Sequence, residues 1–330
     1  MQPFLDVVEV NIPVTWDCSV QSCRQNLRPV RGHKLFSSKY GLPSFDNLLF
    51  RDNYILSYDN RLKHAVWVVD HVKFKRDSGR NDYSFNFYSD HQIHQRFRSS
   101  NRDYINSGYD RGHLSPARQH KTNIDMLEQS YELSNVAPQT PDLNRGVWKI
   151  LEEYVYSFLP LHSKNVYSVT GTLYDTGDSG YNVIGPNRVG VPTHFYKVIV
   201  HESRSKIKGR IIMEAFVMPN AEYSSRSGFS SSSSSTSTGS SSSTSTEEVS
   251  SQEDYSEGYS SSVYTDSEEY TDSEGVSSSD NSAISLEEFR IDIDHDLSRL
   301  EKDTGLRFFD KLNRDQLTKP SRFIYDFEVL

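Results

Sequence analysis

The sequence is poor in cysteine and in long apolar runs, and both shortages exclude classes of protein. Its only cysteines are Cys18 and Cys23, too few for a disulfide framework or a cysteine-rich zinc site. Two free thiols and one local disulfide are both compatible with this pair. No stretch approaches the roughly eighteen apolar residues that a membrane-spanning helix needs. We therefore expect no membrane span.

Basic residues are missing from the beginning of the chain. Residues 1–10 include two acidic side chains, and no Lys or Arg precedes Arg24. Transit peptides are rich in Arg and poor in acids, and signal peptides begin with a basic region. No transit peptide is therefore visible in this sequence. Either the protein is not targeted in this way, or the chain shown is a processed or incomplete form.

Acidity and polarity are concentrated in one segment. The chain is only 35% apolar and its net charge is −9. Residues 223–285 contain 28 Ser among 63 residues, and eleven acidic residues against one base, Arg226. The charge of this segment is −10, which leaves about +1 for the rest of the chain. Such a composition cannot bury a core, so we expect a disordered acidic insertion at 223–285.

A short repeat lies inside this insertion, at 264–269 and 270–275. Thr265 and Thr271 each precede a Glu by three residues, a spacing that suits an acid-directed protein kinase as a partner. Each phosphate would add about 1.5 to 2 negative charges. One hypothesis is that the polyanion competes with substrate for a phosphate-binding surface. The alternative is a solvated spacer without a regulatory role.

Outside the insertion, the sequence predicts an α+β fold with a central, largely antiparallel sheet flanked by helices. Residues 1–35 are expected to form an N-terminal extension, and 36–222 with 286–330 a single domain. Strand-like stretches lie before and after a helical middle, without regular βαβ alternation. Residues 73–108 are expected to be mostly loop. The expected strands are 54–59, 65–70, 165–170, 187–191, 195–201 and 210–218, and the expected helices are 123–134 and 144–159, the latter ended by Pro160. Leu297 and Leu300 form a further helical pattern, and Gly305 after it resembles a C-cap.

The segment Asp110-Arg111-Gly112-His113 places an acid, a guanidinium, a flexible residue and an imidazole side by side. An imidazole can accept a proton near neutral pH, as a general base for water must. The structural alternative is also open, because an Asp–Arg pair can fix a loop and a His can end a strand. We take His113 as the candidate base.

Asn144 and Glu152 follow at the start of the predicted second helix. Eight residues of α-helix separate two side chains by about 12 Å along the axis and roughly 80° in rotation, so both can face one cleft but not bind one ion directly. Asn144 is then the direct ligand, and Glu152 acts through water. Few protein oxygens and many waters suit Mg²⁺. The alternatives are an N-cap role for Asn144 and a solvated charge for Glu152.

Several ordered motifs together resemble the endonuclease G-like DNA/RNA non-specific endonucleases, which have a ββα-metal (His-Me finger) core. The similarity covers most of the chain outside the extension and the insertion, neither of which belongs to the family pattern. It is carried by residues 39–43, 101, 103–104, 107–113, 133–139, 143–144, 148, 151–152, 183–185, 191–197, 217–220, 300–301 and 304–306.

This resemblance implies a role for each matching residue. His113 would be the general base, Asn144 the ligand of Mg²⁺ (with Mn²⁺ able to substitute), and Glu152 the residue that orients water on the metal. Arg111 and Asn135 would stabilise the transition-state charge and the leaving group. Asp110 would order the loop, and Gln139 and Arg98 would lie near the phosphate. Apart from the resemblance, Arg145 beside Asn144 is either a phosphate contact or a solvated charge.

The resemblance also implies a function and a setting. The substrates would be DNA and RNA, cleaved with low sequence specificity because none of the site residues reads a base edge. A homodimer and mitochondrial residence, with action in the nucleus as well, would follow. The competing hypothesis is a catalytically inactive nucleic-acid-binding or interaction protein on the same fold.

Overall fold

The computed structural model describes residues 40–72, 85–175, 180–204, 211–223 and 285–318. All of them belong to one compact unit, formed by 1–224 and 284–330. The expected extension at 1–35, with Cys18 and Cys23, lies outside the described residues. So does the insertion with Thr265 and Thr271, apart from Tyr223 and Ser285 at its two ends.

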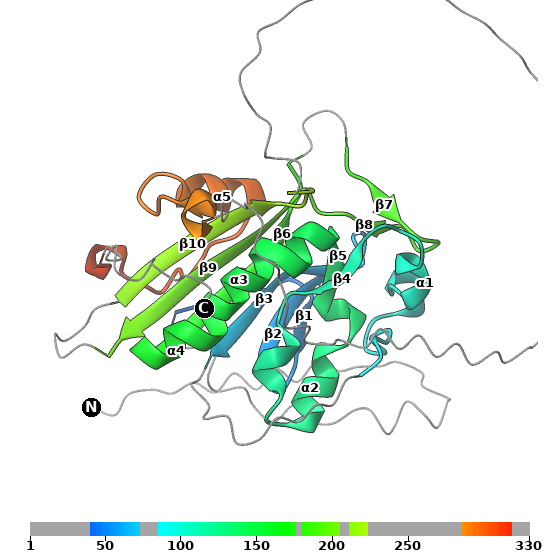
Figure 1. Ribbon diagram of the computed structural model, residues 1–330, viewed down its shortest axis with the longest axis horizontal. Coiled ribbons are helices and arrows are strands. Elements are labelled where there is room, and N and C mark those ends of the chain that lie inside the picture. Colours follow the sequence, from blue (N-terminus) through cyan, green and yellow to red (C-terminus); the bar gives the residue numbers. More distant parts are fainter. Residues whose placement is uncertain (1–39, 73–84, 176–179, 205–210, 224–284, 319–330) are drawn as a thin grey trace, which may run out of the picture. The chain divides into compact units, whose positions relative to one another are not determined.

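The unit is built on a seven-stranded antiparallel sheet with helices on its faces, so the predicted α+β class is confirmed (Figure 1). The β-branched and aromatic stretches that predicted strands do form them. In sheet order the strands are β1 (Leu48–Phe50), β2 (Tyr54–Asp59), β3 (His64–Val72), β6 (Ser163–Leu173), β9 (His194–Ser203), β10 (Ile211–Pro219) and β11 (Arg290–Ile291). Because β10 pairs with β11, the described segments on both sides of the insertion share this sheet.

Alternation along the strands gives the sheet two apolar faces. One face, with Val68 and Phe195, packs under a helical run from Leu143 to His162. The other face, with Trp67 and Val198, packs against α5 (Leu297–Thr304). In Figure 1 the helical run from Leu143 to His162 crosses in front of the strands. Gly305 ends α5 with a left-handed φ of 70°, as its predicted C-cap role requires.

The helical run on the first face departs from the predicted regular helix. It consists of a π-helical turn (Leu143–Val147), α3 (Trp148–Glu153), a second π-helical turn (Tyr154–Phe158) and α4 (Leu159–His162). Pro160 was expected to end it, and this was wrong. The π-helical turn restarts the hydrogen-bond pattern, so Pro160 lies in a first turn that needs no N–H from it. Residues 141 and 142 are already helical, so Asn144 lies inside the run, and the alternative of Asn144 as N-cap was wrong too.

The remaining elements are short. The helix predicted at 123–134 ends earlier, as α2 (Ile124–Ser130), and its N-cap Asn123 accepts a hydrogen bond from the Met126 N–H. The strand predicted at 187–191 is a two-stranded hairpin, β7 (Val183–Ile184) with β8 (Val189–Gly190). The others are α1 (Asn101–Tyr104), β4 (Asp110–His113), β5 (Val136–Gln139) and the 3-10 turns Gln95–Phe97, Ala117–His120, Leu133–Asn135, Leu286–Phe289 and Arg314–Gln316. In the described part of the chain, no helix is long and apolar enough to cross a bilayer.

Candidate active site

A two-stranded ribbon presents the Asp-Arg-Gly-His segment. The whole segment is strand β4, and it pairs antiparallel with β5 from Asp110 opposite Gln139 to His113 opposite Val136. Gly112 is needed here because the Gln139 side chain fills the space beside it. A Cβ at position 112 would lie 2.0 Å from Gln139 Oε1 and 2.7 Å from its Cγ. Gln139 is fully buried, so its side chain does not lie in solvent where it could turn away freely.

Gly112→Ala should therefore lower the free energy of unfolding by about 1–3 kcal/mol through overpacking. Gln139→Ala removes the obstructing atoms, so Gly112→Ala should cost clearly less in that background. Denaturant unfolding of wild type, both single variants and the double variant measures this. Equal costs in both backgrounds would show that Gln139 is not the reason for the glycine.

The His113 imidazole lies between two aromatic rings. The ring of Phe87 is 5.0 Å away, and that of Tyr131 meets it edge-on at 5.1 Å. Nε2 is buried and has no hydrogen-bond partner among the described residues, which leaves Nδ1 as the nitrogen open to water. Burial lowers the pKa of His113 to about 4. The imidazole is therefore neutral at pH 7, the form that a proton acceptor needs.

Arg111 is held on the same strand by two neighbours. Its guanidinium lies 5.0 Å from the centre of the Phe87 ring, and Nη1 donates a hydrogen bond to Asn101 Oδ1 over 3.2 Å. Asn101 in turn donates from Nδ2 to the Phe87 carbonyl over 2.6 Å. Phe87 thus contacts both Arg111 and His113. These contacts leave part of the guanidinium exposed, so it can bind an anion.

Asp110 joins this ribbon to the helical run. Its carboxylate accepts hydrogen bonds from Asn144 Nδ2 over 2.9 Å and from Arg145 Nε and Nη2 over 2.9 and 2.7 Å. A carboxylate only accepts, so it fixes which end of the Asn144 amide faces it. The amide oxygen Oδ1 points away and has no hydrogen bond among the described residues. Asn144 therefore presents one oriented, partly exposed oxygen.

Glu152 lies two turns further along, on α3, above a buried charge cluster. Burial raises its pKa, while the nearby Lys197 ammonium acts in the opposite direction. Lys197 is itself fully buried, on β9. The regular-helix geometry expected between Asn144 and Glu152 does not apply. The π-helical turn and Gly146, with φ −103° and ψ −115°, interrupt the helix between them.

Asn135 and Gln139 were predicted to act on the substrate, but both side chains are fully buried. Asn135 uses its amide internally. It accepts from the Ser115 N–H and donates to the carbonyls of Ser115 and Ser130, all over 2.9 Å. It therefore fixes the chain just after His113 and has no free group for a leaving oxygen. Gln139 packs beneath Gly112, so a direct phosphate contact is not available to it either.

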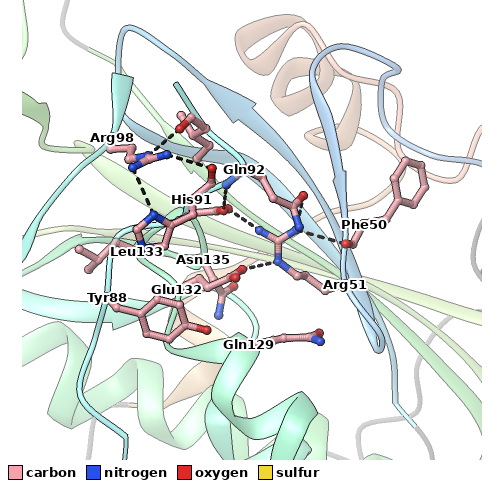
Figure 2. Close-up of polar contacts among 12 residues, drawn as sticks. Phe50, Arg51, Tyr88, His91, Gln92, Arg98, Gln129, Glu132, Leu133 and Asn135 are labelled. Carbon is pink, nitrogen blue, oxygen red and sulfur yellow. Dashed lines mark hydrogen bonds and ion pairs between the residues drawn. The ribbon is translucent and has the colours of Figure 1, made fainter. Parts of the chain in front are cut away.

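Arg98 is also engaged elsewhere. Figure 2 shows its guanidinium turned toward His91, and it donates to the carbonyls of Ile93 and His91 over 2.6 and 2.9 Å. Its role in this structure is to tie its own loop together. Of the nine predicted site residues, Asp110, Asn144 and Arg145 meet directly, and Arg111 and His113 share Phe87.

Sequence reasoning did not identify the residues that support the His113 cradle. The Tyr88 N–H donates to the Tyr131 carbonyl over 3.2 Å, which places Phe87 beside Tyr131. A buried ion cluster fixes the same two segments, because the Arg51 guanidinium pairs with both Asp90 and Glu132 (Figure 2). Burial raises the pKa of Glu132 to about 7, although Arg51 acts in the opposite direction. An Arg in the short turn between β1 and β2 gave no sequence signal of such a cluster.

The fold and the site together define a centre of the hydrolase type, with an imidazole on strand β4 and an oriented amide oxygen on the helical run that Asp110 contacts. The family model for DNA/RNA non-specific endonucleases matches residues 31–257, and the chain belongs to this family.

Individual proteins that are similar to this chain agree with this assignment. The chain is similar to human mitochondrial endonuclease G, with 42% identity over 56% of this chain and 63% of that protein. It is also similar to the mitochondrial nuclease of Saccharomyces cerevisiae, with 37% identity over 57% of this chain and 62% of the other. The matches thus span less than two thirds of these relatives. A chain of the crystal structure of the EndoG/EndoGI complex superposes with a TM-score of 0.59 and 32% identity, covering 85% of this chain and 92% of that one.

Proposed function

We propose that this protein is a Mg²⁺-dependent endonuclease that hydrolyses phosphodiester bonds in DNA and RNA with low sequence specificity. The observation that supports the proposal is that strand β4 carries both a neutral, shielded imidazole, His113, and the carboxylate, Asp110, that orients the Asn144 amide oxygen. Phosphodiester hydrolysis needs a proton acceptor for water and an electrophile at the leaving oxygen.

His113 takes the proton from the attacking water at Nδ1. A base with a pKa near 4 is weak in the free protein, but an adjacent phosphate is negative and raises the pKa of an imidazole. Substrate binding therefore strengthens the base when it is needed. Arg111, held by Phe87 and Asn101, places positive charge on the non-bridging oxygens. Arg145, with an exposed side chain, contacts the flanking phosphates.

The residues present fit a hard divalent cation. Asn144 Oδ1 is the ligand oxygen, and Asp110 holds it in place. In the described part of the chain, no group of three His, Cys, Asp or Glu side chains is arranged to hold a metal. An ion here would keep most of its waters, which is the habit of Mg²⁺; Mn²⁺ should substitute. When bound, the ion supplies Lewis-acid stabilisation of the leaving oxygen. Glu152 holds and orients water beside it.

Setting and partners follow from the same family. We propose a homodimer, mitochondrial residence with action in the nucleus as well, and a single nuclease domain interrupted by the acidic insertion. Phosphorylation of that insertion by an acid-directed kinase belongs to the same set of proposals. The names of the relatives support the mitochondrial setting.

Covalently closed plasmid DNA and single-stranded RNA test the reaction directly. With Mg²⁺ the wild-type protein should nick and then linearise the plasmid and degrade the RNA, because an endonuclease needs no free end. A chelator should stop both reactions, and Mg²⁺ added in excess should restore them. A protein that binds both nucleic acids yet cleaves neither, with Mg²⁺ or Mn²⁺, would instead be the inactive binding protein.

A further inference from the structure

One lysine lies fully buried in the middle of the sheet, directly beneath the candidate site. Lys197 on β9 is 0% exposed. Its ammonium donates hydrogen bonds to Thr170 Oγ1 over 2.5 Å and to the Tyr156 hydroxyl over 3.4 Å. It lies 5.1 Å from the centres of the Trp148 and Tyr156 rings. A charge in such a place is costly unless it is paired.

Strand register places this lysine in a polar stripe on an otherwise apolar face. Thr170 is directly opposite Lys197, and Asp70 is opposite Ser168, two residues before Thr170 on the same strand. Residues two apart on a strand share a face. Asp70, Ser168, Thr170 and Lys197 therefore cross three adjacent strands on the face that the helical run covers. The other positions of that face that pack under the helical run are largely apolar, including Val68, Val166 and Ile199.

Two carboxylates balance the ammonium, and each belongs to a different half of the site. Tyr156 links the ammonium to Asp70, because its hydroxyl accepts from Lys197 over 3.4 Å and donates to Asp70 over 3.1 Å. The Trp148 ring beside the ammonium lies one turn before Glu152 on α3. Burial lowers the pKa of Lys197, and the negative charges of Glu152 and Asp70 act against that shift. Glu152 comes from α3, the half that follows Asn144. Asp70 accepts a hydrogen bond from Ser115 Oγ over 2.7 Å, and Ser115 lies two residues beyond His113 and is bonded to Asn135.

A purely structural role does not account well for this arrangement. Replacing buried ion pairs by apolar groups is often neutral or stabilising, and a methionine would fill the same space. The remaining polar groups lie at the edge of the cluster. They are the Tyr156 hydroxyl, which donates to Asp70 over 3.1 Å, His120, which contacts Ser115 over 2.8 Å, and Arg118 near Glu152. Lys197 is the only fully buried cation in the described residues that faces both carboxylates.

We propose that Lys197 is a positioning residue that holds Glu152 and Asp70 in place and so fixes the two halves of the site relative to each other. The inference rests on the proposed nuclease function. Lys197 touches neither substrate nor metal; it acts through Glu152 and through the Asp70–Ser115 contact.

Lys197→Met tests this in the full chain with Mg²⁺. The kcat on DNA should fall about 10- to 100-fold, the range found when a residue supporting a metal ligand is lost. KM should change little, because the lysine is buried away from the substrate. Lys197→Arg keeps the charge and should recover part of the activity. In a Glu152→Gln background, Lys197→Met should cause a smaller loss than in wild type, because only the Asp70–Ser115 route remains.

A metal-free measurement separates positioning from general destabilisation. Without Lys197, the pKa values of Glu152 and Asp70 rise further. A carboxylate with a raised pKa in the folded state stabilises at low pH and loses that contribution as pH rises. In chelator, the Tm of Lys197→Met should therefore fall relative to wild type between about pH 5 and pH 8. Glu152→Gln should make this fall shallower.

Glu214→Gln is the matched control. Glu214 is a buried charge on β10 on the same face, and it is bonded to Tyr154 and His201 rather than to the site. The Glu214→Gln substitution should lower Tm without lowering kcat. If Lys197→Met does not fold, Thr170→Val removes one partner of the ammonium and should lower kcat in the same direction.

Two results would overturn the inference. One is a folded Lys197→Met or Thr170→Val protein with wild-type kcat. The other is a loss of kcat from Lys197→Met that is as large in the Glu152→Gln background as in wild type. The proposed function fails separately, if the wild type does not cleave or if Glu152→Gln cleaves normally.

Discussion

Replacing His113 by Ala should lower kcat on DNA by about 10²- to 10⁴-fold, the contribution expected of a general base. Binding of DNA should hardly change. Burial lowers the pKa of His113 to about 4, so at pH 7 the residue carries no charge that could attract phosphate. The measurement compares single-turnover cleavage and DNA affinity of wild type and His113→Ala at one salt concentration, since phosphate contacts depend on salt.

Added imidazole provides the control for this variant. The substitution leaves space between the rings of Phe87 and Tyr131, and free imidazole fits there with its nitrogen near the reacting water. Partial recovery of cleavage would identify the lost group as the proton acceptor and not as a fold element. Equal cleavage by wild type and His113→Ala, or a loss matched by an equal loss of DNA binding, would refute the assignment.

The parts of the fold that the sequence predicted well are those with a strong local pattern. Strands β2, β3, β6, β9 and β10 are runs of β-branched and aromatic residues, and each was expected within a few residues of its observed ends. The α5 cap at Gly305 was also predicted, because the residue type and its place after an apolar helical pattern agree. Local signals suffice where the chain's own preference decides the conformation.

The missed elements depend on contacts between distant residues. Strand β4 consists of Asp-Arg-Gly-His, which has no strand-like composition, and pairing with β5 alone makes it extended. The π-helical turns around α3 arise from packing on the sheet, and this packing allowed Pro160 inside the run. No residue-by-residue pattern contains that information.

The site residues also divide into those that residue type alone predicted and those whose role depends on contacts with distant residues. The sequence indicated His113, Arg111 and Asn144 by type, and the structure leaves a free nitrogen, a partly exposed guanidinium and a free oxygen on them. It also indicated Asn135, but type alone cannot show that the Ser115 and Ser130 backbone already uses its amide. Lys197 could have been found, because a lysine occupies an inward position of an alternating strand whose inward neighbours are Phe195 and Ile199.

Asn144→Ala should reduce cleavage by at least about 100-fold at limiting Mg²⁺, because the oxygen proposed as the metal ligand would supply several kcal/mol through the ion. Asn144→Asp provides an oxygen but should not rescue. Its carboxylate would replace an amide N–H₂ that lies 2.9 Å from Asp110. Two carboxylates so close cannot both ionise freely, so the pair would take up a proton and lose its geometry.

The exchanged pair decides whether Asp110 orients the ligand. In Asp110→Asn with Asn144→Asp, the new amide donates to the new carboxylate, which again presents a free oxygen. Activity should return to within about tenfold of wild type, since support of a metal ligand is worth about 10- to 100-fold. Loss of one Arg145 contact matters little, because that side chain is 66% exposed. Mg²⁺ titrations of wild type, Asn144→Ala, Asn144→Asp and the double variant measure this. If the double variant cleaves no better than Asn144→Asp alone, Asp110 serves only to fold the loop.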